Sequence, residues 1–166
     1  MKHILILLIF IWGVSSCNHQ INEEKAPIIK SDSLVVQQDL AQVKDLIRHS
    51  FEDIWSNLDS TKIATHHTDD FLLLENGIVW NNDSVKHYLN RERKEMEVYQ
   101  YKRLNTFDFI QSVHNQTSIW IAYNNYGTWV KGTDTLGSVH WLESVIAVKD
   151  RDKWKLQQLH STTVKN

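Results

Sequence analysis

Two ionisable side chains near the C-terminus, Glu143 and His160, have a spacing that could support acid–base chemistry. The segment 150–153 (DRDK) is polar and is predicted to form a tight turn between two long strands. Pairing outward from the centre of this turn places Glu143 opposite His160, and opposed side chains on one sheet face lie about 5 Å apart. A carboxylate at that distance could orient the imidazole as a general base. Tyr123, on the neighbouring strand, could face the same space.

This pairing depends on the strand register. A slip by one residue would instead turn Leu142 and Ser144 toward the pocket, because side chains alternate between faces along a strand. Alternatively, Glu143 and His160 could form an ion pair on the outer sheet surface or at a dimer interface. All three arrangements are compatible with the sequence.

Other catalytic and metal-binding patterns do not occur in the sequence. Among nine histidines, His66 and His67 are adjacent, so their side chains diverge on a helix, and there is no HxxxH or HExxH spacing. His160 and Ser161 point to opposite faces of a strand and cannot act as a base and nucleophile. There is no GxSxG elbow and no glycine-rich phosphate loop. We therefore expect neither a metal nor another cofactor.

The elements that must position these residues begin with three helices. Apolar residues recur at three- and four-residue steps over 40–58, which predicts a long amphipathic helix. Asp59 can cap a short second helix that ends near residue 67. Asn82 or Asp83 is expected to cap a third helix.

Strands complete the predicted α+β domain. The segment 69–80 (DDFLLLENGIVW) contains Asn76-Gly77, the strongest short-range hairpin signal, between two apolar runs. Four long aromatic and β-branched segments follow, joined by short turns, at 98–114, 118–131, 136–149 and 153–164. This order predicts helices packed on one face of a curved antiparallel sheet.

The only cysteine, Cys17, follows a hydrophobic run. Residues 4–14 carry no charged or polar side chain, yet they are too few to span a bilayer, which requires about 20 apolar residues. They follow the basic Lys2 and have the length of the hydrophobic region of a secretory signal peptide. The segment 14–17 (VSSC) looks like a bacterial lipobox, whose cysteine is lipidated. The alternative is an ordinary signal peptide with an incidental cysteine.

The chain is therefore expected to have three parts. These are a lipoprotein signal peptide at 1–16, a polar tether at 17–33 and a globular domain at 34–166. Acyl chains on Cys17 would hold the protein at a membrane surface of the bacterial cell envelope without spanning the membrane.

Charge and composition bear on the partners. The chain has 18 Lys and Arg against 20 Asp and Glu, a net charge of −2. It lacks the basic balance typical of nucleic-acid-binding proteins. Seven Trp, five Tyr and five Phe supply enough large apolar area for a core and a lined pocket. The expected partner is a small apolar or aromatic molecule, and we expect no nucleic acid.

The order of elements, with the segments 56–77 (SNLDSTKIATHHTDDFLLLENG) and 149–162 (KDRDKWKLQQLHST), resembles the nuclear transport factor 2-like superfamily. This superfamily includes ketosteroid isomerases and SnoaL-like cyclases. The resemblance covers about residues 37–163. It implies three helices on a strongly curved antiparallel sheet, a cone-shaped pocket between them and, as in many members, a homodimer. Because the fold hosts many chemistries, the function must be argued from the site.

The resemblance also bears on Glu75. Compared with the isomerases over 67–77, the general-base carboxylate falls on Glu75, where it could abstract a proton next to a carbonyl. Alternatively, Glu75 only borders an exposed turn. The oxyanion-binding tyrosine of the isomerases falls on Phe51, which has no hydroxyl, and their protonated aspartate falls on Ser144, within one residue of register. Without these donors an enolate has no partner, which argues against steroid-type isomerisation.

Three functional hypotheses follow. The leading one is a lipid-anchored exported domain that binds a small molecule without catalysis. The second is a SnoaL-like lyase, isomerase or hydrolase that uses the pocket residues Glu75, Glu143 and His160, with Tyr123 nearby. The third is a protein-interaction module that uses the sheet face, which is also the expected surface of a homodimer.

Overall fold

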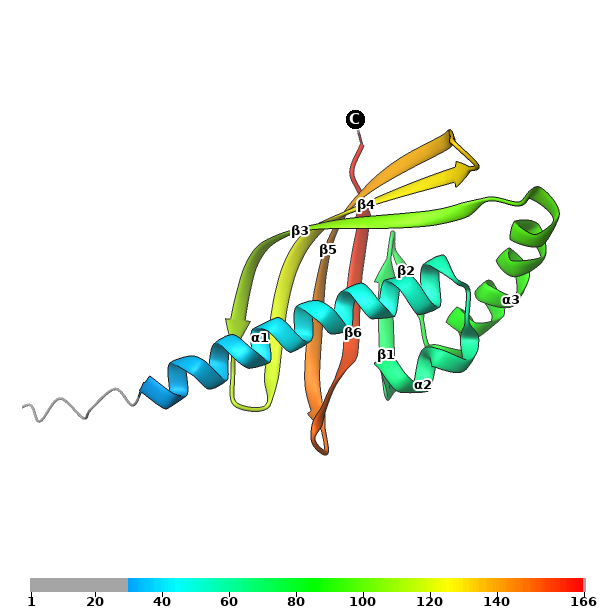
Figure 1. Cartoon of the computed structure of the whole chain (residues 1–166). Helices are drawn as coiled ribbons and strands as arrows, with labels where there is room; N and C mark the ends of the chain where they lie inside the picture. The colour runs from blue at the N-terminus through cyan, green and yellow to red at the C-terminus, as the bar shows by residue number, and fades with distance from the viewer. Residues whose placement is uncertain (1–29, 166) are drawn as a thin grey trace, which may run out of the picture.

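Helices cover the concave side of a curved six-stranded sheet, as Figure 1 shows for residues 30–165, which the computed structural model describes. The predicted α+β fold is confirmed. The predicted signal peptide (1–16) and Cys17 lie outside the described residues. Between residues 30 and 165, no helix combines the length and apolar character needed to cross a membrane.

The long first helix packs its apolar stripe on the sheet. Helix α1 (Lys30–Ser50) continues into a π-helical turn, η1 (Phe51–Ser56). Val43, Ile47 and Ile54 are fully buried, which confirms the amphipathic pattern. The helix begins four residues before the predicted domain boundary at 34, so the last part of the predicted tether is helical.

The second helix and the hairpin form as predicted. The carboxylate of Asp59 accepts a 2.9 Å hydrogen bond from the backbone N–H of Thr61, at the start of the 3-10 turn η2 (Ser60–Lys62) and helix α2 (Ile63–His66). Strands β1 (His67–Glu75) and β2 (Ile78–Trp80) are antiparallel. Both residues of the Asn76-Gly77 turn have positive φ angles, 47° and 86°, as a tight hairpin turn requires.

The third helix, α3 (Asn82–Tyr99), is capped one residue earlier than predicted. The side chain of Asn81 accepts a 2.9 Å hydrogen bond from the Ser84 N–H. Asn82 is the first helical residue, and its side chain instead donates to the carbonyl of Thr68 at 2.8 Å. A run of three consecutive Asn and Asp residues offers several possible caps, and contact with β1 decides among them.

Four long strands form most of the sheet. They are β3 (Lys102–His114), β4 (Ser118–Lys131), β5 (Asp134–Asp150) and β6 (Lys153–Thr163). The order across the sheet is β2-β1-β6-β5-β4-β3, and β1 and β6 run parallel. The first long strand starts at Lys102 instead of 98, because α3 continues through Tyr99.

A β-bulge in β6 changes the predicted register. The 150–153 turn sets the pairing up to Ala147 with Leu156, as predicted. The next pair is Ile146 with Gln158, so Gln157 is an extra residue on β6. Beyond this point, every residue of β6 faces the side opposite to the one the turn predicts.

Asp39 connects α1 to the sheet through a buried polar cluster. Its carboxylate accepts hydrogen bonds from Trp154 Nε1 at 3.1 Å and Lys149 Nζ at 3.3 Å, and it lies 3.2 Å from His114 Nε2. Burial raises the pKa of Asp39, but these three partners outweigh burial and lower the pKa below its usual value. The cluster fixes α1 across β3, β5 and β6, and so fixes the helical wall of the pocket.

Candidate functional site: an aromatic pocket with two carboxyl groups

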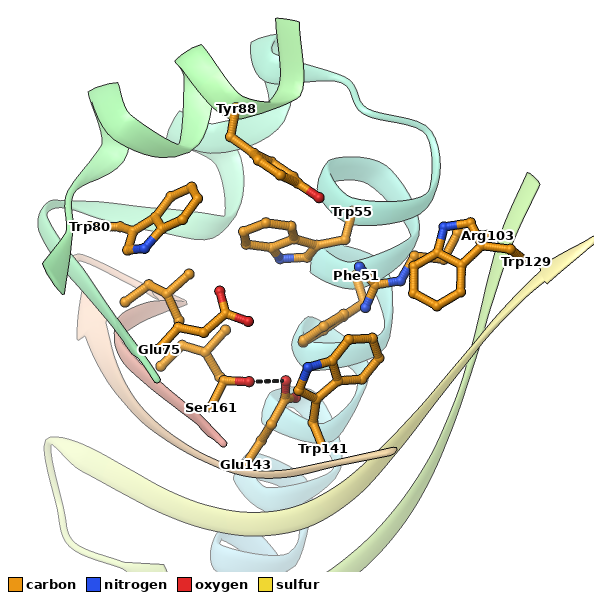
Figure 2. A pocket seen from close by; sticks show the side chains of 12 residues that line it. Phe51, Trp55, Glu75, Trp80, Tyr88, Arg103, Trp129, Trp141, Glu143 and Ser161 are labelled. Atoms are coloured by element: carbon orange, nitrogen blue, oxygen red, sulfur yellow. Dashed lines mark hydrogen bonds between the residues drawn. The ribbon is translucent and has the colours of Figure 1, made fainter. Parts of the chain in front are cut away.

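A pocket of about 200 Å³ lies between the helices and the concave face of the sheet. Figure 2 shows the side chains that surround it. They come from η1, α3 and all six strands, so the whole domain contributes to the pocket. The lining residues are Phe51, Trp55, Leu73, Glu75, Trp80, Tyr88, Arg103, Trp129, Trp141, Glu143, Leu159 and Ser161.

Four aromatic rings form the helical side of the pocket. Phe51 and Trp55 project from η1, and π-helical turns often occur at functional sites. The Tyr88 ring, from α3, lies with its centroid 6.0 Å from that of Trp55 and 5.5 Å from that of Trp80. These rings present broad, rigid apolar faces to the cavity.

Two of these rings carry buried hydrogen-bond donors that no other side chain or backbone group in the described part of the chain accepts. Trp55 is 8% exposed, and its Nε1–H, like that of Trp80, is buried without a hydrogen-bond partner among residues 30–165. Both indoles line the pocket in Figure 2. An unpaired buried donor carries a penalty of about 1–3 kcal/mol, which an acceptor entering the pocket would relieve.

Arg103 is a site residue that our sequence analysis missed. Its guanidinium carbon lies 4.8 Å from the ring centroid of Trp141 and 5.3 Å from that of Trp129, within cation–π range. Its Nε donates to Asn105 Oδ1 at 3.1 Å, and Asn105 donates to Ser56 Oγ at 2.8 Å. Arg103 is thus held at the rim of the cavity by β3 and η1.

Glu143 lies at the base of the pocket in a network of hydrogen bonds. Ser161 Oγ donates to one carboxyl oxygen at 3.0 Å, and Asn125 Nδ2 donates to the other at 3.2 Å. Burial raises the pKa of Glu143 to about 7, even though Ser161, the charge of Arg103 and Asn125 act to lower it. Near neutral pH this carboxyl group is therefore present in both its neutral and its ionised form.

Glu75, at the end of β1, also points into the pocket (Figure 2). Burial raises its pKa above the usual value, and the charge of Arg103 acts in the opposite direction. Glu75 precedes the Asn76-Gly77 turn, yet its carboxyl group faces the cavity together with that of Glu143. The structure therefore brings two of the predicted site residues together.

Tyr123 lies beneath the pocket and does not line it. It pairs with Glu143 across β4 and β5, and its side chain is fully buried. Its ring packs against Phe107 and Phe109 at centroid distances of 5.8 and 5.7 Å. Burial and the neighbouring Glu143 raise the pKa of Tyr123 well above its usual value. Tyr123 therefore belongs to the core beneath the site.

The predicted pairing of Glu143 with His160 is wrong. The bulge at Gln157 pairs Glu143 with Ser161, and His160 pairs with Ser144. His160 is exposed and alternates with the buried Ser161, so it lies on the outer face of the sheet.

The structure also places a carboxyl group one residue from the position that the comparison with the isomerases assigned to Ser144. That comparison placed Ser144 at the position of a protonated acid, within one residue of register. In the structure Glu143 faces the pocket, whereas Ser144 pairs with His160 on the outer face. Phe51 lines the pocket, and its ring has no hydroxyl to donate.

The described residues do not assemble a metal site. No group of three or more His, Cys, Asp or Glu side chains within 30–165 has the geometry to hold a metal ion. The polar groups of the pocket lining are instead two carboxyl groups, a guanidinium, a serine hydroxyl, the Tyr88 hydroxyl and indole N–H groups.

Gly127, on β4, makes room for the rings on the sheet side of the pocket. A Cβ atom at this position would lie 2.6 Å from the Trp141 ring and 3.4 Å from Arg103 Nε. Glycine inside a strand often marks such a close approach. Trp141 and Arg103 can lie over β4 only because position 127 has no side chain.

We predict that Gly127→Ala weakens binding of aromatic molecules in the pocket about tenfold, since Trp141 must move off the strand and toward the cavity. The matched control is Gly137→Ala on β5, where a Cβ atom meets nothing within 4 Å. Calorimetric titration of both variants with the same aromatic compound measures the difference. Equal affinities in the two variants would show that Trp141 does not shape the binding site.

Comparisons with known proteins were made at the levels of sequence and structure. No family model and no curated protein matches the sequence. Solved structures match in shape. An NTF2-like protein with a cystatin-like fold from Novosphingobium aromaticivorans has a TM-score of 0.67 at 7% identity, covering 86% of this chain and 93% of that one. The chain has the nuclear transport factor 2-like fold.

Two further structures share this nuclear transport factor 2-like fold with the chain. ActVI-ORFA from Streptomyces coelicolor has a TM-score of 0.67 at 15% identity and covers 78% of this chain and 98% of that one. A conserved protein from Planctomyces limnophilus has a TM-score of 0.61 at 10% identity, with coverages of 77% and 98%. At such identities the likeness establishes the fold, and the function rests on the pocket residues themselves.

Proposed function

We propose that this nuclear transport factor 2-like domain binds a small aromatic molecule in its pocket without transforming it. The observation that supports this proposal best is the set of six aromatic rings around a cavity of about 200 Å³. Binding sites for small molecules are typically concave and apolar, with a few convergent polar groups that fix orientation. Arg103, Glu75 and Glu143 would supply that orientation.

A thermal-shift screen of aromatic metabolites on the full-length protein tests this proposal. A ligand that binds only the folded state raises the melting temperature, and the rise increases with the logarithm of its concentration relative to its Kd. We expect stabilisation of the wild type and of Gly137→Ala, and a smaller shift for Gly127→Ala. The proposal fails if no aromatic compound stabilises the protein, or if the stabilisation is the same in all three proteins.

Acid–base catalysis is the second candidate, and the two convergent carboxyl groups favour it. Burial raises the pKa of Glu143 to about 7, which suits proton transfer near neutral pH, and burial also raises the pKa of Glu75. The residues lining the pocket in the described part of the chain include no histidine, so this candidate relies on the carboxyl groups alone.

A bound carbonyl compound would then exchange its α-protons for deuterium in D2O, and Glu75→Gln would abolish the exchange. Binding without exchange favours the non-catalytic function.

Attachment to a membrane of the bacterial cell envelope through Cys17 is part of the same proposal. Mass spectrometry of the mature protein should find an acylated cysteine as the first residue, and Cys17→Ser should abolish acylation and membrane fractionation. An unmodified mature N-terminus at any other residue would contradict lipid anchoring.

We also propose that the outer sheet face forms a homodimer. Leu72, Leu104, Tyr126 and Leu142 lie on four strands of this face, and each is 41–53% exposed. Exposed apolar side chains clustered on a sheet commonly mark an interface.

Sedimentation of the full-length protein should show a dimer that Leu142→Lys dissociates. The control Ile78→Lys, on the edge strand β2, should leave the dimer intact. A monomer at micromolar concentration would contradict the dimer, and co-purification of a stoichiometric foreign protein would favour an interaction module instead.

A further inference from the structure

We propose that the pocket selects planar aromatic molecules that carry an anionic oxygen group, an aromatic carboxylate being the simplest example. This inference rests on the proposed binding function and adds the chemical class of the ligand. Three groups with hydrogen-bond donors, from β3, η1 and β2, line the cavity, and each has at least one donor without an acceptor among residues 30–165.

The first donor is the Arg103 guanidinium. Among residues 30–165 its side chain makes a single hydrogen bond, through Nε to Asn105, and no carboxylate lies within 4.0 Å of it to form an ion pair. Stacking on Trp129 and Trp141 covers its faces and leaves its terminal nitrogen atoms available. A guanidinium in this position is suited to a planar, bidentate acceptor such as a carboxylate.

The other two donors are the indole N–H groups of Trp55 and Trp80. Both are buried and unpaired within the described part of the chain, and both belong to the pocket lining. Indole nitrogen donates but cannot accept a hydrogen bond, so these two groups require an acceptor atom. Trp55 is more than nine-tenths buried, which excludes ready compensation by bulk water.

The two acidic side chains set the conditions under which an anion can enter. Glu143 is held by Ser161 and Asn125, and Glu75, on β1, pairs with the same Ser161. Ionised, the two carboxylates would repel an anionic ligand; neutral, they add O–H donors. Burial raises the pKa of Glu143 to about 7, so its neutral form is present near neutral pH, and burial also raises the pKa of Glu75. Protonation of either group weakens the repulsion and leaves the Arg103 charge to attract the ligand.

A matched series of naphthalenes tests the inference by calorimetric titration of the full-length protein at pH 6. The probes are 2-naphthoate, the neutral ketone 2-acetylnaphthalene, the hydrocarbon 2-ethylnaphthalene and the cation 2-naphthylmethylammonium. We expect 2-naphthoate to bind at least about tenfold more tightly than 2-ethylnaphthalene, since charge-assisted hydrogen bonds exceed neutral ones in strength. The ketone should fall between them, and the cation should bind most weakly.

Variants connect this preference to the donors. Arg103→Met and Trp55→Phe should each lower the affinity for 2-naphthoate about tenfold, with little change for 2-ethylnaphthalene. Trp120→Phe, outside the pocket lining, should change neither affinity. If a variant fails to fold, the affinities of the wild type for the four naphthalenes still test whether the pocket prefers an anionic group.

The outcomes distinguish the proposal that the pocket binds aromatic molecules from the proposal that it prefers an anionic group. Equal affinities for the carboxylate and the hydrocarbon, or a preference for the cation, would overturn the anionic class while leaving aromatic binding intact. The absence of binding by any naphthalene would overturn both. A carboxylate preference that survives Arg103→Met and Trp55→Phe would assign the selectivity to other residues and contradict the inference.

Discussion

Glu143→Gln is expected to stabilise the protein by about 3 kcal/mol at pH 8, with little effect at pH 4.5. Glutamate has an unfolded-state pKa near 4.5, and in the folded protein the pKa of Glu143 is raised to about 7. A raised pKa means that its contribution to stability is fully present below pH 4.5 and is lost as the pH rises through 7. A neutral amide removes this loss, and its carbonyl can still accept hydrogen bonds from Ser161 or Asn125.

Urea denaturation between pH 4.5 and pH 8 measures this effect. The control is Glu97→Gln, an exposed position on α3, which should leave the pH dependence of the wild type unchanged. If Glu143→Gln and wild type lose stability in parallel as the pH rises, Glu143 is not a buried carboxyl group with a raised pKa. The acid–base part of the account would then be wrong.

His67 is expected to affect the pH dependence of stability in the direction opposite to Glu143, because it destabilises the fold when the pH falls. Burial lowers its pKa from 6.5 to about 4, even though a hydrogen bond with Asn82 favours the charged form. Because the pKa is lowered, His67 contributes to the free energy of unfolding above pH 6.5, and this contribution is lost as the pH falls through 4. The free energy of unfolding decreases by about 3 kcal/mol over this range. Its ring stacks on Phe71 at 3.7 Å, so a charged ring would be buried against an apolar one.

The variant His67→Gln should therefore remove this acid-side slope, although losing the stacked ring lowers its stability at every pH. Urea denaturation of Glu143→Gln exposes the His67 slope most clearly, since in the wild type the two groups oppose each other between pH 4.5 and 6.5. The double variant should have the flattest profile of the series. An unchanged slope below pH 6.5 in His67→Gln would assign acid sensitivity to other groups.

Local signals in the sequence predicted the helices and the hairpin well. The period of apolar residues in α1, the Asp59 cap and the Asn76-Gly77 turn each depend on residues close together in the chain. The resemblance to the isomerases implied the position of Glu75 in the pocket, with the border of an exposed turn as the alternative. The cap of α3 differed by one residue, because the contact of Asn82 with β1 is long-range.

The strand register limited the prediction of the site. The bulge at Gln157 coincides with a change in apolar spacing, because Trp154 and Leu156 are two residues apart whereas Leu159 follows Leu156 by three. This signal was overlooked, and the bulge places Ser161 instead of His160 beside Glu143. Arg103 was missed because a single arginine on a strand normally reads as a solvent-facing residue. The available signal was the spacing of Arg103 and Asn105: residues two apart on a strand lie on the same face, so two polar residues share the inward face of β3. Only the assembled sheet shows that this side is the wall of a cavity.

The pocket combines groups that a purely structural core would avoid. Among residues 30–165, the Arg103 guanidinium has no ion-pair partner and two indole donors are unpaired, and such groups reduce stability unless a ligand satisfies them. Two carboxyl groups with raised pKa values share the same cavity. Such unsatisfied groups gathered in one concave, aromatic site are typical of ligand binding.

The most direct test of this account is the two-dimensional proton–nitrogen NMR spectrum of the tryptophan indoles during titration with 2-naphthoate. We expect the Trp55 and Trp80 Nε1–H signals, assigned with Trp→Phe variants, to shift downfield and saturate together as these donors gain an acceptor. The Trp120 signal, from outside the pocket lining, should stay in place. Saturable shifts confined to Trp120, or no indole shift at a saturating concentration, would contradict the pocket as the binding site.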